Sequence, residues 1–173
     1  MRLLIRRIRS TDRLDRFDCG DEDLNTYAYS YATRFCGDGY PSTIVAVDEE
    51  IDQPVGLLFL NSHRGRDSSG QPLPPELGSV LVLDSIMVTS DYHFRGVATQ
   101  LFREVFRQFV LIGPGLGLQA MAVAAQDDWL RIRLTREGLR QSGIVVDGYA
   151  ISWRDASERY EVLLSQAEDL GTT

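Results

Sequence analysis

Residues Val80 to Phe109 read VLVLDSIMVTSDYHFRGVATQLFREVFRQF, and this stretch decides the fold. Its first part, up to Val88, is apolar and interrupted only by Asp84 and Ser85, which is typical of a buried strand. After a short polar loop, apolar residues recur at every fourth position and form one stripe of a helix: Val97, Leu101, Val105 and Phe109. The stretch therefore predicts a strand, a small-residue turn and a helix.

The turn between this strand and this helix contains the small residues Gly96 and Ala98. A helix N-terminus carries unpaired amides and the positive end of the helix dipole, and so favours anions. Small residues would let a bulky diphosphate approach that backbone closely. The pattern indicates either a site for a phosphate-bearing ligand or an ordinary strand-to-helix turn. It matches neither a Walker loop nor the dinucleotide Gly-x-Gly-x-x-Gly motif.

A known signature resembles this turn. His93-Phe94-Arg95-Gly96-Val97-Ala98, behind Ile86-Met87-Val88, resembles the acetyl-CoA signature of the GCN5-related N-acetyltransferases, Gln/Arg-x-x-Gly-x-Gly/Ala. His93 is the departure, because Gln or Arg is usual there. The resemblance implies acetyl-CoA as co-substrate, held mainly through main-chain amides, and no metal. The residues that it implies contact the cofactor are Ile86, Met87, Val88, His93, Phe94, Arg95, Gly96, Val97, Ala98, Thr99 and Gln126.

A second signature lies near the start of the chain. The residues Phe17, Cys19, Gly20, Leu24, Asn25 and Tyr27 resemble the Phe-x-Cys-Gly-x-x-x-Leu-Asp/Asn-x-Phe/Tyr opening of a branch of that family. The branch includes the acetyltransferase toxins of bacterial toxin–antitoxin pairs. Acidic residues crowd the start of the helix predicted here, as its dipole favours. We expect its apolar side to contain Leu24, Tyr27, Tyr31 and Phe35, and Cys19 to be a small buried residue and not a nucleophile.

The two signatures, in the family's order, predict an α/β (α+β) fold with a mixed, mostly antiparallel central sheet and flanking helices. A helix joins the strands Val80–Val88 and Leu118–Ala125, which are therefore predicted to be parallel neighbours. The resemblance implies that these two strands splay apart and that pantetheine inserts between them. The other predicted strands are Arg2–Ile8, the hairpin of Ser42–Val47 and Val55–Leu60, and a final pair, Ile144–Trp153 and Tyr160–Leu164.

The remaining segments are predicted as loops, one helix and a tail. His63–Pro75 reads as an exposed loop, in which Arg64 and Arg66 could contact substrate. Gln126-Asp127-Asp128-Trp129 opens a helix that ends near Gly138 or Gly143, and Ser165–Thr173 reads as a loose tail.

Composition limits the class of protein. A chain of 173 residues fits a single domain over residues 1–173. With 18 basic and 25 acidic residues and a net charge of −7, it is a poor general binder of nucleic acid, although a charged tRNA remains an option. Nothing approaches the length of a membrane span. Two cysteines and no signal peptide favour a reduced, cytoplasmic compartment.

Acetyl transfer to an amine needs a neutral amine, a donor to the tetrahedral oxyanion and a proton for the leaving thiolate. The resemblance assigns the oxyanion contact to the main-chain amide of Val88. Asp84 could take the amine's proton through water, or be a structural carboxylate at the end of the sheet. The toxin branch places a Phe-Tyr pair in a later helix. When Asp127 and Gly138 are aligned with that pattern, Leu134 occupies the tyrosine position.

Leu134 cannot donate a proton, so three readings stay open. Tyr149 or Tyr92 could supply the hydroxyl, solvent could protonate the thiolate, or the protein binds acyl-CoA without turnover. The leading hypothesis is an acetyl-CoA-dependent N-acetyltransferase that acts on a primary amine of a small molecule, a peptide or an aminoacyl group. The alternatives are a toxin-like enzyme acting on aminoacyl-tRNA and a non-catalytic acyl-CoA-binding module. The last strands of this fold commonly build dimers, so a homodimer is a further option.

Overall fold

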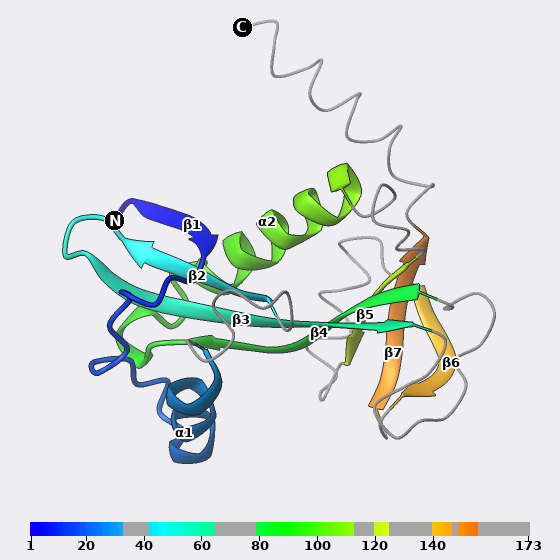
Figure 1. The fold of residues 1–173 in the computed structure, drawn as a ribbon, viewed down its shortest axis with the longest axis horizontal. Coiled ribbons are helices and arrows are strands. Elements are labelled where there is room, and N and C mark those ends of the chain that lie inside the picture. The colour runs from blue at the N-terminus through cyan, green and yellow to red at the C-terminus, as the bar shows by residue number, and fades with distance from the viewer. Residues whose placement is uncertain (33–41, 65–78, 113–119, 125–139, 147–148, 156–173) are drawn as a thin grey trace, which may run out of the picture. The chain divides into compact units, whose positions relative to one another are not determined.

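Two compact units make up the chain in this computed structural model. The first comprises residues 1–61 and 83–106, and the second comprises residues 62–82 and 107–173. The structure describes residues 1–32, 42–64, 79–112, 120–124, 140–146 and 149–155 (Figure 1). Each unit is described by itself below. The organisation as a single domain over residues 1–173 stays a prediction.

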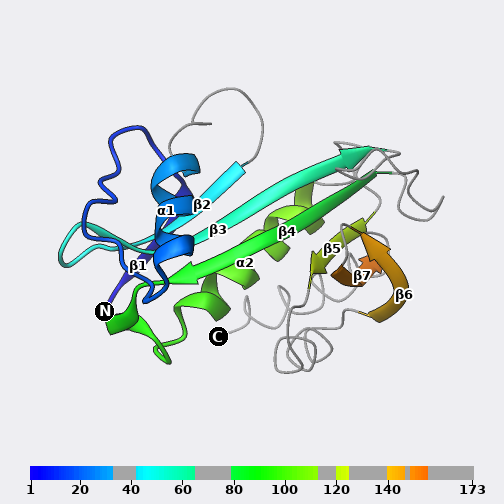
Figure 2. The ribbon, with the colours of Figure 1, turned by 90° about the horizontal axis from the view of Figure 1, so that it is seen from below.

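Four strands form the antiparallel sheet on which the first unit is built. They are β1 (Leu3–Arg7), β2 (Ser42–Asp48), β3 (Gln53–Arg64) and β4 (Ser79–Val88), in the order β1-β2-β3-β4. Leu3 pairs with Asp48, and Ser42 pairs with Leu60, each in an antiparallel register. β4 runs opposite to β3 (Figure 2). The predicted hairpin and the predicted first and central strands are therefore confirmed.

One boundary in this sheet differs from the prediction. β3 continues through His63 to Arg64, although an exposed loop was predicted to begin at His63. The segment Asn61-Ser62-His63-Arg64 contains no Gly or Pro, the residues that usually end a strand. Its polar composition alone was therefore a poor sign of a loop. Arg66 lies outside the described residues.

The helix α2 (Val97–Ile112) covers one face of this sheet, and a short 3₁₀ turn, η2 (Ser90–Tyr92), precedes it. All four residues of the predicted stripe are buried: Val97, Leu101, Val105 and Phe109. The helix approaches β3 at Gly56, where an added Cβ would lie 2.7 Å from Val97 Cγ1 and 2.9 Å from Leu101 Cδ1. A residue without a side chain at position 56 thus sets the distance between α2 and the sheet.

The helix α1 (Glu22–Tyr31) lies on the other face (Figure 1). Its buried residues are Ala28 and, just beyond its last turn, Ala32, which pack into a core with Phe17, Phe59 and Met87. The predicted apolar side is therefore wrong in part. Leu24 and Tyr31 are exposed, Tyr27 is only partly buried, and Phe35 lies outside the described residues.

Besides the end of β3 and the start of β4, the second unit contains three described strands, β5 (Ala120–Ala124), β6 (Arg140–Val146) and β7 (Tyr149–Asp155). β7 pairs antiparallel with both β5 and β6. The prediction of one strand over Ile144–Trp153 is wrong, because that range contains the end of β6 and most of β7. The dipeptide Asp147-Gly148 separates the two strands in the sequence, and Asp-Gly is a strong hairpin signal that the prediction overlooked.

The start of β6 also corrects the predicted helix that opens at Gln126, because Arg140 begins a strand and the helix cannot extend to Gly143. Gln126 itself, Tyr160–Leu164 and the predicted tail lie outside the described residues. The start of β4, up to Val82, belongs to the second unit with β5, whereas its end, where the splay is predicted, belongs to the first, so the splay stays a prediction. No helix within the described ranges is long and apolar enough to cross a membrane.

Candidate functional site

The turn from β4 to α2 is fixed by hydrogen bonds to two distant parts of the first unit. The main-chain nitrogen and the hydroxyl of Thr89 both donate to the carbonyl of Val55 in β3, at 3.0 and 3.4 Å. Ser90 donates to the carbonyl of Asp18 twice, from its nitrogen at 2.8 Å and from its hydroxyl at 3.2 Å. The turn therefore holds its shape without a ligand.

The end of this turn presents unpaired main-chain donors. Phe94 has a φ of 61° and Gly96 a φ of 81°, and the first helical hydrogen bond runs from Gln100 to Gly96. Among the described residues, the N–H groups of Phe94, Gly96, Val97 and Ala98 have no acceptor. Alternating φ signs before a helix N-terminus turn successive amides to one side and build a concavity that favours anions.

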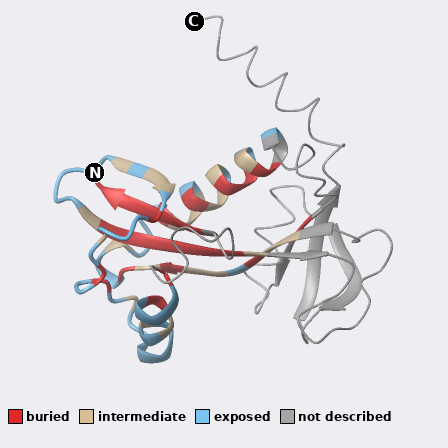
Figure 3. Cartoon of the chain, viewed as in Figure 1, coloured by how far each residue is buried: buried red, intermediate tan, exposed pale blue. Residues whose placement is uncertain are grey.

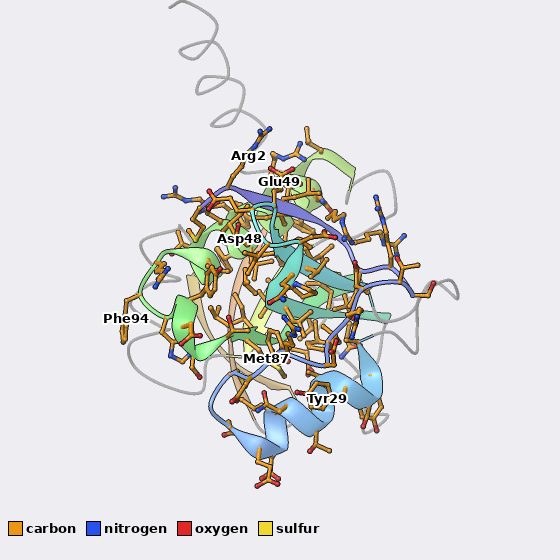
Figure 4. The ribbon with its side chains drawn as sticks, turned by 90° about the vertical axis from the view of Figure 1, so that its left-hand side faces the viewer. Arg2, Tyr29, Asp48, Glu49, Met87 and Phe94 are labelled. Carbon is orange, nitrogen blue, oxygen red and sulfur yellow. The ribbon has the colours of Figure 1, made fainter. Side chains whose placement is uncertain are left out.

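Gly96 is required for its conformation and not for space, because a Cβ there would meet nothing within 4 Å. Phe94 adopts the left-handed region without that freedom, and its side chain is fully exposed. Figure 4 shows Phe94 pointing away from the rest of the first unit. A bulky residue in this region is held there by its surroundings, as often occurs at functional turns.

His93, the departure from the acetyl-CoA signature, forms a hydrogen bond across the turn. Its Nε2 lies 2.9 Å from the carbonyl oxygen of Val88, the last residue of β4. Because a carbonyl only accepts, Nε2 carries the hydrogen in this arrangement. The imidazole thus ties the end of the strand to the turn, and it occupies a Val88 carbonyl that could otherwise pair with a ligand.

Tyr92 is tied to the end of β2. Its hydroxyl donates to Asp48 Oδ2 at 2.7 Å, and this hydrogen bond raises the pKa of Tyr92 and lowers that of the Asp48 carboxyl. Arg95 stacks over the Tyr92 ring, with its guanidinium carbon 5.2 Å from the centroid. A hydroxyl already donated to a carboxylate is poorly suited to protonate a thiolate, which counts against Tyr92 as the acid.

The Phe17–Tyr27 signature builds the loop that holds this turn. Asp18 Oδ1 accepts from the nitrogen of Gly20 and from Nδ2 of Asn25, both at 2.8 Å, while Asn25 Oδ1 accepts from the nitrogen of Cys19 at 2.9 Å. Gly20 has a φ of 85°, and an added Cβ would lie 3.1 Å from the Ser90 hydroxyl. The two sequence signatures are therefore parts of one structure.

Cys19 is half-buried against the core, with its Sγ 3.8 Å from the carbonyl of Asp21. A thiol that packs against apolar residues and donates to a carbonyl has a structural environment, although Cys19 is only half-buried where a buried residue was predicted.

Asp84 has a partner that sequence reasoning missed. It is exposed on β4, and the hydroxyl of Tyr27 in α1 donates to its Oδ2 at 3.2 Å. Burial, with a further contribution from the charge of Asp84, raises the pKa of Tyr27 to about 12. Nearby, the hydroxyl of Ser85 is buried and has no partner among the described residues. The signal that could have revealed this pair is Tyr in place of Phe at the last signature position.

The other predicted site residues fall into separate places. Met87 is buried in the core beneath α1, so only its main chain is available to a ligand (Figure 4). Ile86, Val88, Ala98 and Thr99 are half-buried. Tyr149 begins β7 in the second unit, and Gln126 and Leu134 lie outside the described residues. The cofactor contact of Gln126 and the role of Tyr149 as the acid stay predictions.

Solved structures resemble this chain over nearly its whole length. A tyrosine-to-phenylalanine mutant of the toxin AtaT, bound to the C-terminus of the antitoxin AtaR and acetyl-CoA, is 14% identical with a TM-score of 0.72, covering 93% of this chain and 98% of that one. The KacTA–DNA complex is 15% identical with a TM-score of 0.75, covering 95% and 99%. AtaT complexed with an acetyl-methionyl-tRNA is 15% identical with a TM-score of 0.73, covering 94% and 99%.

No model of a protein family and no curated protein matches the sequence. At identities this low, the structural likeness concerns the fold. The chain has the fold predicted from its two signatures, that of the GCN5-related N-acetyltransferases, in the form seen in the AtaT and KacT toxins.

Proposed function

We propose that the chain is an acetyl-CoA-dependent N-acetyltransferase that acts on a primary amine. The observation that carries the proposal is the fixed turn from β4 to α2, whose free amides at Phe94, Gly96, Val97 and Ala98 form an anion-binding concavity. The pyrophosphate of acetyl-CoA would accept from these amides. AtaT, which has the same fold, was solved with acetyl-CoA bound.

The chemistry follows from the residues near the end of β4. The amine attacks the thioester carbonyl, its C–N bond forms as the C–S bond breaks, and the main-chain amide of Val88 donates to the oxyanion. Asp84 takes the amine's proton through water, since its carboxylate is exposed and held by Tyr27. The thiolate is protonated by Tyr149 or by solvent.

The test combines binding and turnover. Acetyl-CoA should raise the thermal midpoint of the chain, and coenzyme A should be released in the presence of a suitable amine from a panel. Gly96→Glu should abolish both, because it places a carboxylate in the concavity and a side chain at a positive φ. No stabilisation by acetyl-CoA would refute the proposal, whereas tight binding without turnover would identify a non-catalytic acyl-CoA-binding module.

A second candidate is acetylation of the amino group of an aminoacyl-tRNA, in the manner of a toxin. The Phe17–Tyr27 signature and the AtaT complex with an acetyl-methionyl-tRNA favour it. The net charge of −7 opposes it, because binding tRNA needs a basic surface. Growth arrest on expression, relieved by a small co-transcribed partner, would support this candidate; unaffected growth would count against it.

A further inference from the structure

We propose that Asp48 and Tyr92 are positioning residues that hold the guanidinium of Arg95 beside the anion-binding turn. This inference rests on the proposed function, because the anion in question is the cofactor's phosphate group. Neither Asp48 nor Tyr92 needs to contact the cofactor. Their role would be to fix the position of the positively charged guanidinium of Arg95.

The first step is the anchoring of Asp48. Its side chain is buried at the end of β2, where its main chain pairs with Leu3 of β1. Its Oδ1 accepts from the nitrogen of Glu50 at 3.0 Å, and its Oδ2 accepts from the Tyr92 hydroxyl at 2.7 Å. Each oxygen thus has a partner, and the carboxylate is fixed to the sheet.

The second step is the anchoring of Tyr92 at both ends. Its hydroxyl is bound to Asp48, and its main-chain nitrogen donates to the carbonyl of Thr89 at 2.8 Å. An aromatic ring that is held at its backbone and at its tip presents one fixed face. Arg95 lies over that face, 5.2 Å from the centroid, and its own nitrogen donates to the Tyr92 carbonyl at 3.3 Å.

The third step concerns the donors of Arg95. Within the described ranges, no carboxylate lies within salt-bridge distance of its guanidinium. Asp48 holds the ring over which the guanidinium lies, but it forms no salt bridge with it. Both oxygens of Asp48 already have donors, and the charge of Arg95 acts on Asp48 without a salt bridge between them. Its N–H groups therefore remain open to a ligand, next to the free amides of Phe94 and Gly96.

Such a device matters because the chain as a whole repels a polyanion. Its net charge is −7, and coenzyme A is itself strongly negative. A cation fixed at the turn acts over a distance shorter than the Debye length of about 8 Å at physiological salt, where screening is incomplete. Stacking also reduces the side-chain entropy that Arg95 would lose on binding.

The experiment measures the dissociation constant of coenzyme A, and of pantetheine as the phosphate-free probe, by calorimetry at two salt concentrations. The variants are Arg95→Leu, Tyr92→Leu, Tyr92→Phe and the double variant Tyr92→Leu/Arg95→Leu. Arg103→Leu is the matched control, because it removes the same charge from an exposed position of α2. Unfolding curves check that each variant folds.

Arg95→Leu and Tyr92→Leu should each weaken coenzyme A by about fivefold, and the double variant by no more than either. Arg95→Leu and Tyr92→Leu should both make the affinity for coenzyme A depend less on salt, and Tyr92→Phe should show smaller changes in the same direction. The affinity of each variant for pantetheine, and the affinity of Arg103→Leu for coenzyme A, should match those of the parent. Additive losses, an equal loss for pantetheine, or a Tyr92→Leu variant that binds like the parent would overturn the inference alone. A parent that does not bind coenzyme A would overturn it together with the proposed function. If Tyr92→Leu fails to fold, Tyr92→Phe decides, and an unchanged salt dependence in that variant overturns the inference.

Discussion

α1 and α2 cover opposite faces of the same sheet, but only α2 buries the face that its sequence predicts. α2 buries its apolar stripe, with Leu101 and Val105 at 0% and 1% exposure. α1 leaves Leu24 and Tyr31 at 39% and 38% exposure and buries Ala28 (Figure 3). Two helices of one unit therefore use different means to dock on one sheet.

The difference teaches how each helix is held. α2 fills the space above Gly56 with branched side chains, so its periodic pattern and its packing agree. α1 approaches through small alanines, and its tyrosines use their hydroxyls: Tyr29 donates to the carbonyl of Phe17 at 2.6 Å and Tyr27 donates to Asp84. Tyr is apolar along its ring and polar at its tip, which makes apolar periodicity a poor guide for such a helix.

The largest effect expected from this comparison is that of Leu101→Ala in α2. Removing a fully buried leucine should lower the free energy of unfolding by about 3 kcal/mol, through lost burial and the cavity that remains. The matched control is Leu24→Ala in α1, which should cost less than about 1 kcal/mol because that leucine is substantially exposed. Urea denaturation measures both, and equal losses would contradict the contrast between the helices.

Gly56→Ala tests the close approach of α2. The new methyl group would lie less than 3.0 Å from Val97 and Leu101 and should lower the free energy of unfolding by about 1–3 kcal/mol. It should also weaken the binding of acetyl-CoA, because it displaces the first turn of α2. Gly96→Ala is the control, since its Cβ meets no atom and only its positive φ is strained. Thermal denaturation without acetyl-CoA measures the effect of each variant on stability, and the added stabilisation by acetyl-CoA measures its effect on binding. A Gly56→Ala variant as stable as the parent would show that α2 does not press on the sheet there.

Asp21→Ala sharpens the reading of α1 as a helix held by polar contacts. The Asp21 side chain accepts from the nitrogen of Leu24 at 3.0 Å and caps the helix, so its loss should cost about 1 kcal/mol. Asp23→Ala, in the same first turn, removes a charge without removing the cap and should cost less. Chemical denaturation gives both values. Equal losses would mean that charge near the dipole, and not the cap, stabilises α1.

The smallest effect concerns the pH dependence of the loop before α1. Hydrogen bonds from Gly20 and Asn25 hold the pKa of Asp18 below its ordinary value of 3.8. A lowered folded-state pKa gives stability that is fully present above about pH 3.8 and is lost as pH falls through the folded-state value. The stability difference between the parent and Asp18→Asn should therefore shrink as pH falls below that value.

Unfolding free energies measured between pH 3 and pH 6 test this expectation. The control is Asp23→Asn, whose carboxylate has no hydrogen-bond partner among the described residues. A difference between the parent and Asp18→Asn that stays constant across the range would contradict it.

The parts of the fold that sequence could predict are those with one dominant local signal. The stripe of α2, the hairpin of β2 and β3, and the two signatures each depend on short spacings, and the structure has them where expected. The α1 face failed because several tyrosines compete with alanines for burial. The β6–β7 boundary failed because an apolar run outweighed an Asp-Gly dipeptide.

The contacts within the candidate site were beyond sequence reasoning for a different reason. His93 and Val88 form a local pair, but no sequence pattern predicts that an imidazole will turn back to donate to a carbonyl. Tyr92 with Asp48 and Tyr27 with Asp84 join residues 44 and 57 positions apart. Such pairs depend on the register of the sheet, which alternation alone does not specify.

The binding of the turn to Val55, Asp18 and Val88 couples folding to affinity. Because this loop is already ordered in the free chain, a ligand would find its donors assembled and would lose little by freezing them. The same arrangement creates a vulnerability. Any substitution that frees Ser90 or Thr89 would lower the midpoint of unfolding and the occupancy by ligand together, so the two quantities should vary in proportion across a set of variants in this loop.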